Sequence, residues 1–179
     1  LRVGQGGTGS LEIANGGLVI SRIGDVAYEL DSSGSVTIDG TDSLWDVNSL
    51  NMGRLGEGTL AITGGGQLET TSSFLASFLG SQASVTVSGE ASHWDSSSNL
   101  TIGAQGEADL EVTGGGSVTS RHLWIAQDRR GIGLVEVTGF GSSLSSVDNF
   151  YVGYGGSGVL NLNAGGSAAG DDFFIAYNP

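Results

Sequence analysis

The chain has 179 residues, of which 33 are glycine, one is proline and none is cysteine, and 19 acidic residues against six arginines give a net charge of −13. Such an acidic surface repels nucleic-acid phosphates and anionic lipid headgroups, and no apolar run approaches the roughly 18 residues of a membrane helix, so we expect no nucleic-acid partner and no membrane insertion of this segment. With 38% hydrophobic residues and no glycine at every third position, the composition also excludes disorder and a collagen helix, and favours many tight turns between short strands.

The sequence repeats about every 50 residues. An apolar residue followed by glycine recurs at Val3-Gly4, Met52-Gly53, Ile102-Gly103 and Val152-Gly153, at spacings of 49, 50 and 50. Gly-Gly pairs beginning at positions 16, 65, 115 and 165 give the same spacings. The repeats therefore span 1–49, 50–99, 100–149 and, in part, 150–179, within one domain that we expect to be a segment of a longer chain.

Each repeat divides into two coils. A small residue ends one strand of every coil, at alternating intervals of 23 and 26 or 27 residues, and these residues are Gly4, Ala27, Gly53, Ala76, Gly103, Ala126, Gly153 and Ala176. This spacing predicts seven complete coils and the start of an eighth, each with three short strands and three turns. The first repeat is one residue short, and we place the missing residue in the connection after Trp45.

Short alternating segments indicate strands with one buried face. In Leu60-Ala61-Ile62 and Leu110-Glu111-Val112 the outer residues are apolar and the middle residue points the other way. Stacking such strands from successive coils predicts an all-β fold, a parallel β-helix. The preference of parallel crossovers for one hand predicts a right-handed solenoid.

The repeats also predict columns of core side chains. One inward column is expected to contain Val19, Trp45, Leu68, Trp94, Val118 and Leu144, followed by Ala168. A second contains Val26, Leu75, Ile125 and Ile175, flanked by Phe74, Trp124 and Phe174. We expect tryptophans to be core residues, with sugar stacking as the role of any that is exposed. Leu144 stands where two earlier repeats have tryptophan, which suggests drift under weak constraint.

The repeat resembles that of type V secretion (autotransporter) passengers and PEP-CTERM-associated proteins. The matching motifs are Leu50-Asn51-Met52-Gly53, Glu57-Gly58-Thr59-Leu60-Ala61-Ile62, Gly65-Gly66, Ser84-Val85-Thr86-Val87-Ser88-Gly89 and Ser92-His93-Trp94. The resemblance covers essentially the whole chain. It implies a β-helix on the bacterial cell surface, held at the outer membrane through regions outside this segment, and passengers of this kind include adhesins, aggregation factors and stalks.

Residues that could carry catalysis are sparse. Glu12 and Glu111 occupy equivalent strand positions two repeats apart, and Asp46 and Asp95 follow equivalent tryptophans about 9.6 Å apart, outside the roughly 5 to 9 Å of glycosidase carboxylate pairs. No lysine is present, and His93 and His122 occupy unrelated positions. We therefore expect no catalytic residues, no metal site and no cofactor.

One cluster of mixed charge stands out. It comprises Arg121, His122, Asp128, Arg129 and Arg130, with Asp171 and Asp172 at the positions equivalent to Arg121 and His122. Such groups are most simply surface ion pairs. The alternative is a recognition patch formed by Arg121, His122, Arg129, Arg130, Asp171 and Asp172.

The leading hypothesis is a non-catalytic extracellular surface rod, a stalk or an adhesin, whose partners are glycans, cell-surface proteins of a host or neighbouring cell, or other copies of itself. Two alternatives remain open from the sequence. One is a fragment of a carbohydrate-active β-helix enzyme, a polysaccharide lyase or hydrolase. The other is a subunit of a filament in which solenoids stack end to end.

Overall fold

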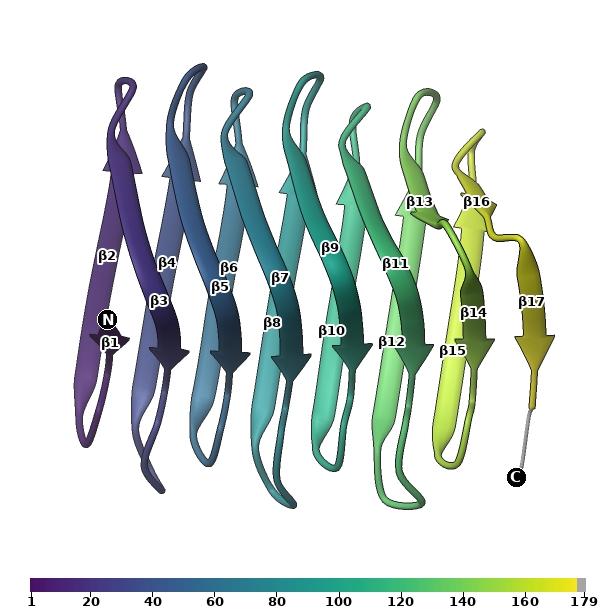
Figure 1. Cartoon of the computed structure of the whole chain (residues 1–179), viewed down its shortest axis with the longest axis horizontal. Coiled ribbons are helices and arrows are strands. Elements are labelled where there is room, and N and C mark those ends of the chain that lie inside the picture. The colour runs from purple at the N-terminus through teal and green to yellow at the C-terminus, as the bar shows by residue number, and fades with distance from the viewer. Residues whose placement is uncertain (177–179) are drawn as a thin grey trace.

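The computed structural model describes residues 1–176 and, over that range, consists of strands and turns without helices. Its strands form two parallel sheets that lie face to face (Figure 1). Sheet B contains β2 (Thr8–Ala14), β4 (Ser33–Asp39), β6 (Glu57–Thr63), β8 (Gln82–Ser88), β10 (Glu107–Thr113), β12 (Ile132–Thr138) and β15 (Ser157–Asn163). Sheet A contains β1 (Arg2–Val3), β3 (Leu18–Val26), β5 (Leu44–Met52), β7 (Gln67–Leu75), β9 (His93–Ile102), β11 (Ser117–Ile125), β13 (Ser143–Ser146), β14 (Asn149–Val152), β16 (Ser167–Ala169) and β17 (Asp172–Ile175).

The architecture is the predicted β-solenoid. In Figure 1 the chain rises along sheet B behind, crosses over the top and descends along sheet A in front while it advances to the right, which makes the coils right-handed. Seven strands of sheet B mark seven coils, in agreement with the sequence. The last predicted repeat, 150–179, extends beyond the described residues.

The prediction of three short strands per coil is wrong for most coils. The segment after each glycine-containing turn and the segment before the next small residue form one strand of nine or ten residues in β3, β5, β7, β9 and β11. The two parts separate only at β13 and β14 and at β16 and β17. No glycine or proline turn interrupts these strands, so the backbone continues through a bend and hydrogen bonding to the neighbouring coils is kept.

The first repeat is one residue shorter than the later ones because they contain a β-bulge that it lacks. The extra residue lies in this bulge and not, as predicted from the sequence, in a connection between strands. In β9 the pairing with β7 shifts between Ser96 and Asn99, whereas β5 pairs with β3 through Val47 without a shift. The Ser96 hydroxyl donates to the Asn99 carbonyl at 3.0 Å across the bulge. Ser146 makes the equivalent bond to Asn149 at 2.8 Å. The shorter first repeat therefore lacks both the extra residue and the serine that caps it.

The predicted inward residues lie in columns. Val19, Trp45, Leu68, Trp94, Val118, Leu144 and Ala168 pair successively along sheet A. The side chains from Trp45 to Leu144 in this series are fully buried, and Val19 and Ala168 at the two ends are partly buried. A second column runs through Val26, Met52, Leu75, Ile102, Ile125, Val152 and Ile175. The core is thus a continuous apolar filling between the two sheets.

The indole N–H of each buried tryptophan donates a hydrogen bond to a hydroxyl group in the preceding coil. The Trp45 indole donates to Ser21 Oγ at 3.2 Å, and the Trp94 indole donates to Thr70 Oγ1 at 3.2 Å. Ser120 occupies the equivalent position before Leu144, and its buried hydroxyl has no hydrogen-bond partner among the described residues. An unpaired buried hydroxyl is costly, so the loss of tryptophan at position 144 removes a specific interaction.

The size of the neighbouring inward side chain in the preceding coil explains why position 144 is leucine and not tryptophan. A Cβ on Gly24 would lie 2.5 Å from the Trp45 ring, so only glycine fits there. In the same column of sheet A, the residue in the coil before Trp94 is Ser73, and the residue in the coil before Leu144 is Leu123. Small residues precede tryptophan and a large one precedes leucine. Close packing therefore gives a structural reason for leucine at position 144, since it keeps the combined volume of the two neighbouring side chains nearly constant.

This packing predicts a rescue. Leu144→Trp alone overfills the core, and Leu123→Ser alone leaves a cavity, so each is expected to cost roughly 1 to 4 kcal/mol of unfolding free energy. Together they recreate the combination of Ser73 and Trp94 found in the second repeat, and the new indole N–H can donate to the Ser120 hydroxyl. We expect the double variant to be more stable than the sum of the single changes by at least about 1 kcal/mol, measured by urea unfolding. Simple additivity would contradict the complementarity.

The small residue after each sheet A strand has a left-handed backbone, with φ of 59° at Gly53 and 53° at Ala76. A Cβ on Gly53 would overlap the backbone carbonyl of Gln82 in the next coil. The methyl group of Ala76, by contrast, is buried in the core. Glycine and alanine alternate because the next coil leaves room for a methyl group at every second position only.

We expect Gly53→Ala to lower the unfolding free energy by more than about 2 kcal/mol, from the clash and the strained φ together. Ala76→Gly is the matched control. It relieves the backbone strain but loses a buried methyl group, so its effect should stay within about 1 kcal/mol. Urea unfolding midpoints of the two variants provide the measurement, and equal effects would refute the explanation.

Candidate functional site

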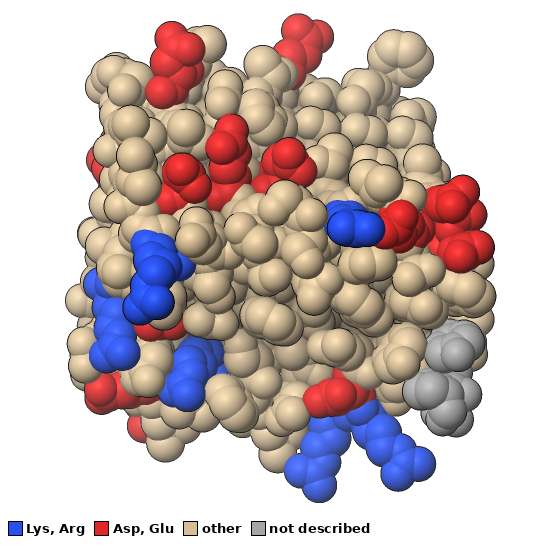
Figure 2. Space-filling model, in the orientation of Figure 1, with Lys and Arg blue, Asp and Glu red and all other residues tan. Residues whose placement is uncertain are grey.

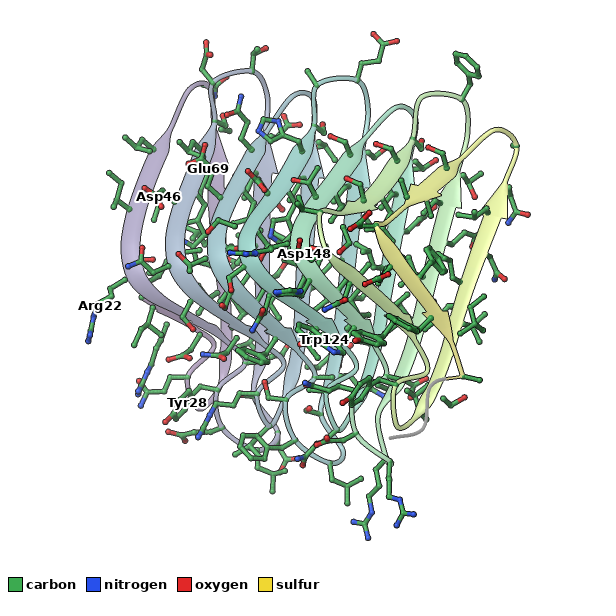
Figure 3. All side chains as sticks on the ribbon, turned by 45° about the vertical axis from the view of Figure 1, so that its right-hand side comes forward. Arg22, Tyr28, Asp46, Glu69, Trp124 and Asp148 are labelled. Carbon is green, nitrogen blue, oxygen red and sulfur yellow. The ribbon has the colours of Figure 1, made fainter. Side chains whose placement is uncertain are left out.

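The outer face of sheet A carries a row of three carboxylates. Asp46 on β5, Glu69 on β7 and Asp95 on β9 pair in register, so neighbouring members stand on strands about 4.8 Å apart. Figure 3 labels Asp46 and Glu69 on this face. Asp46 and Asp95 lie two strands apart as expected. Glu69, which the sequence did not single out, stands between them because it lies about half a repeat from each. Comparing half-repeats would have found it.

This row lies on an open sheet face. Glu69 and Asp95 are exposed, and Thr119 on β11 continues the row and donates to Asp95 Oδ1 at 2.7 Å. A glycosidase acid needs a partly desolvated carboxyl group. No group of three or more acidic or histidine side chains among residues 1–176 is arranged to hold a metal ion. On sheet B, Glu12 and Glu111 lie four strands apart, on β2 and β10.

Two residues of the predicted mixed-charge patch, Arg121 and His122, lie around Asp148, which the sequence did not single out. The Arg121 Nε donates to Asp148 Oδ2 at 2.9 Å, and the His122 Nε2 lies 3.7 Å from the same oxygen. Asn149 Nδ2 approaches His122 Nδ1 at 3.5 Å, and Asp172 pairs with Asn149 in the next coil. Asp148 belongs to the bulge between β13 and β14, and its equivalent in the preceding repeat is the uncharged Ser98, so the repeat pattern gives no signal for a carboxylate there.

Electrostatics in this group follow from one contact. The hydrogen bond and the positive charge of Arg121 hold the pKa of Asp148 below its usual value, with a smaller contribution from His122. The same hydrogen bond raises the pKa of Arg121. Both side chains are open to solvent, with 61% of Arg121 and 38% of Asp148 exposed. The pair therefore orients two polar groups at the surface.

The other arginines of the predicted patch lie elsewhere. Arg129 and Arg130 occupy the turn after β11. Arg121 lies within that strand, four residues or about 13 Å before its last residue. The two turn arginines border a separate hollow with Leu79, Gln105 and Asp128. Asp171 lies in the link between β16 and β17. The structure thus divides the six predicted residues among the Asp148 group, the turn and the last described coil, and Figure 2 shows the charges of this face in small separate groups.

A stripe of aromatic rings also faces outward on sheet A. Trp124, Tyr151 and Phe174 pair in register, and their rings stack at centroid distances of 6.1 Å and 4.8 Å with interplanar angles of 12°. Figure 3 labels Trp124. Rings stacked in this way cover part of one another's faces. Sugar rings stack on aromatic faces, so the proposed sugar-stacking role for an exposed tryptophan is not favoured at Trp124.

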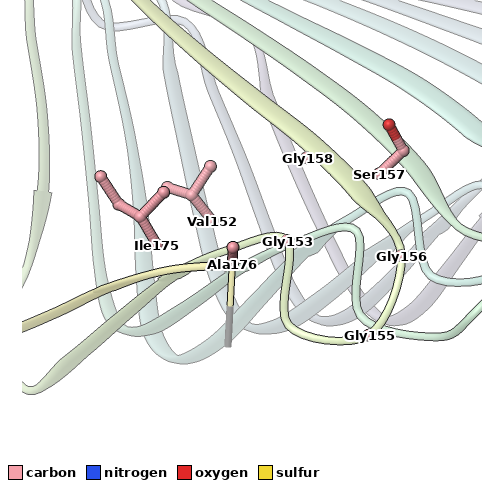
Figure 4. A pocket seen from close by; sticks show the side chains of 8 residues that line it. All are labelled: Val152, Gly153, Gly155, Gly156, Ser157, Gly158, Ile175 and Ala176. Atoms are coloured by element: carbon pink, nitrogen blue, oxygen red, sulfur yellow. The ribbon is translucent and has the colours of Figure 1, made fainter. Parts of the chain in front are cut away.

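Two hollows differ in origin. Figure 4 shows one of about 360 Å³ at the C-terminal end, lined by Val152, Gly153, Gly155, Gly156, Ser157, Gly158, Ile175 and Ala176. At the equivalent Gly53, this space is filled by Gln82 of the following coil, so the hollow reflects the end of the described stack. The second, of about 250 Å³, lies across β11 and is lined by Asp95, Ser96, Ser97, Thr119, Ser120, Arg121, Val147 and Asp148.

Comparisons with protein-family models, curated proteins and solved structures find no significant match. Within residues 1–176 there is no helix long and apolar enough to span a membrane. The class of this protein is therefore defined by its fold, a two-sheet parallel β-solenoid.

The Arg121–Asp148 contact predicts a pH response. Because the pKa of Asp148 is lowered in the folded chain, its contribution to stability is present above the pKa of unfolded aspartate and is lost as pH falls through the lower folded value. Arg121→Met should raise the pKa of Asp148 toward the usual aspartate value, and Arg121→Lys should raise it less. A carboxyl-carbon NMR titration measures both, and an unchanged Asp148 titration in the Met variant would contradict the assignment.

Proposed function

We propose that this chain is a non-catalytic segment of an extracellular rod on a bacterial surface, acting as a stalk or adhesin. The supporting observation is the uniformity of the solenoid, in which seven strands of sheet B pair in one unbroken series. A rigid rod with two long, flat faces suits display or repeated weak contact, and its net charge of −13 limits nonspecific collapse onto anionic surfaces.

Several features favour this role over catalysis. The row of Asp46, Glu69 and Asp95 lies on an open sheet face. The contact with Arg121 shifts the pKa of the surface residue Asp148 in the direction that keeps its carboxyl group ionised. A general acid requires a shift in the opposite direction. Surface location and export by the autotransporter route belong to the same proposal, since they come from the resemblance of the repeats to autotransporter passengers.

End-to-end assembly of solenoids is the second candidate. Open strand edges with apolar side chains can pair with another solenoid end. Such stacking is compatible with a surface rod, because it would lengthen the rod.

The proposed function predicts attachment without turnover. Beads coated with the folded chain should adhere to target cells above the level of beads coated with the heat-denatured chain, and incubation with neutral and acidic polysaccharides should release no new chain ends. Turnover abolished by Asp46→Asn, Glu69→Gln and Asp95→Asn together would establish an enzyme instead. Light scattering of the same preparation over a concentration series reports any filament, and absence of attachment at every assembly state would refute the adhesin role.

A further inference from the structure

The hollow across β11 is lined by residues of two bulges, Ser96 and Ser97 on one side and Val147 and Asp148 on the other. The extra residue of β9 and the one between β13 and β14 lie on the strands either side of β11, while β11 itself pairs without an extra residue. In the first repeat β5 lacks the bulge, so β7 has a bulged neighbour on one side only. Bulges at strand edges and bends often re-aim side chains beside functional sites. Within the described chain, β11 is the strand with a bulged neighbour on each side.

The polar groups in this hollow are held in position but retain capacity for a ligand. Thr119 donates to Asp95 Oδ1, and Arg121 donates through Nε to Asp148 Oδ2. Among the described residues, this leaves the second oxygen of each carboxylate and the terminal nitrogens of Arg121 available. Val147, 70% exposed, supplies an apolar wall at the rim. Donors and acceptors thus alternate around one small space.

From this arrangement we infer that the hollow between the two bulges binds one neutral sugar unit of a glycan chain, through Asp95, Ser97, Thr119, Arg121 and Asp148. The volume of about 250 Å³ lies below the usual range for larger ligands and suits a single ring. Two carboxylates and one guanidinium disfavour anions, on a chain whose net charge is already −13, and the central guanidinium disfavours cations. Hydroxyl groups, which both donate and accept, match these partners.

This inference rests on the proposed surface role and specifies its ligand class. The hollow is open and offers no aromatic face for stacking. Affinity for a single sugar should therefore be weak, with a Kd on the order of 1 mM, and useful attachment would require many copies along a surface.

The test is a ¹⁵N NMR titration of the intact chain with neutral monosaccharides and their β-linked and α-linked disaccharides. Shift changes should concentrate at Asp95, Ser97, Thr119, Arg121 and Val147–Asp148. Arg121→Met and Asp148→Asn should each weaken binding by about tenfold, since one charged hydrogen bond contributes about that much. Arg129→Met, the same substitution in the turn after β11, is the control and should leave binding unchanged.

A second variant tests the origin of the site. Ser96→Val combined with deletion of Ser98 converts the bulged strand into the form seen in β5, where Val47 pairs without a shift. We expect this variant to keep its β-sheet circular dichroism and lose binding. Shifts at the chain ends alone, or none with any neutral sugar, would overturn the inference. Undiminished cell attachment by the Arg121→Met variant would also overturn the sugar-binding inference, but it would leave the adhesin role intact. Absence of attachment by the wild-type chain would refute the proposed function itself.

Discussion

The constraint on which the whole structure depends is the parallel hydrogen-bond ladder between successive coils. Strands about 4.8 Å apart in strict register place every side chain directly over its equivalent in the next coil. An inward position must therefore accommodate its own neighbours along the column. In a globular core, neighbours on many sides can be smaller to make room for a large side chain. Here that room has to come mainly from smaller residues in the coil before or the coil after.

The two tryptophans show how the chain satisfies this constraint. Trp45 and Trp94 are fully buried, and each donates a hydrogen bond to a hydroxyl in the preceding coil. The neighbouring inward residue of that coil is small in both cases, Gly24 before Trp45 and Ser73 before Trp94. Leu144 lacks the small neighbour and leaves the Ser120 hydroxyl without a partner among the described residues. Leucine at position 144 fits the available volume but gives up the hydrogen bond to Ser120. Overfilling the core would destabilise the fold by about as much as one unpaired buried hydroxyl does.

The same register controls the surface. Outward side chains form ladders whether or not they have a function, which produces the carboxylate row through Glu69 and the aromatic stripe through Tyr151. A ladder by itself therefore says little about activity. The bulges interrupt this regularity, and the hollow over β11 lies where two of them stand on either side of one strand. Departures from the repeat are the informative positions in a protein built by repetition.

The sequence by itself determined the solenoid, its seven coils and the members of the inward columns, because a fixed spacing of apolar and small residues leaves one way to stack parallel strands. It also located the missing residue of the first repeat near Trp45. Only the tertiary structure decided that two predicted strands merge into one, that the missing residue is a bulge and that Asp148 pairs with Arg121 while Arg129 and Arg130 lie apart. The physical reason is that these outcomes depend on bends and on contacts between adjacent half-repeats, which hydrophobic periodicity does not encode.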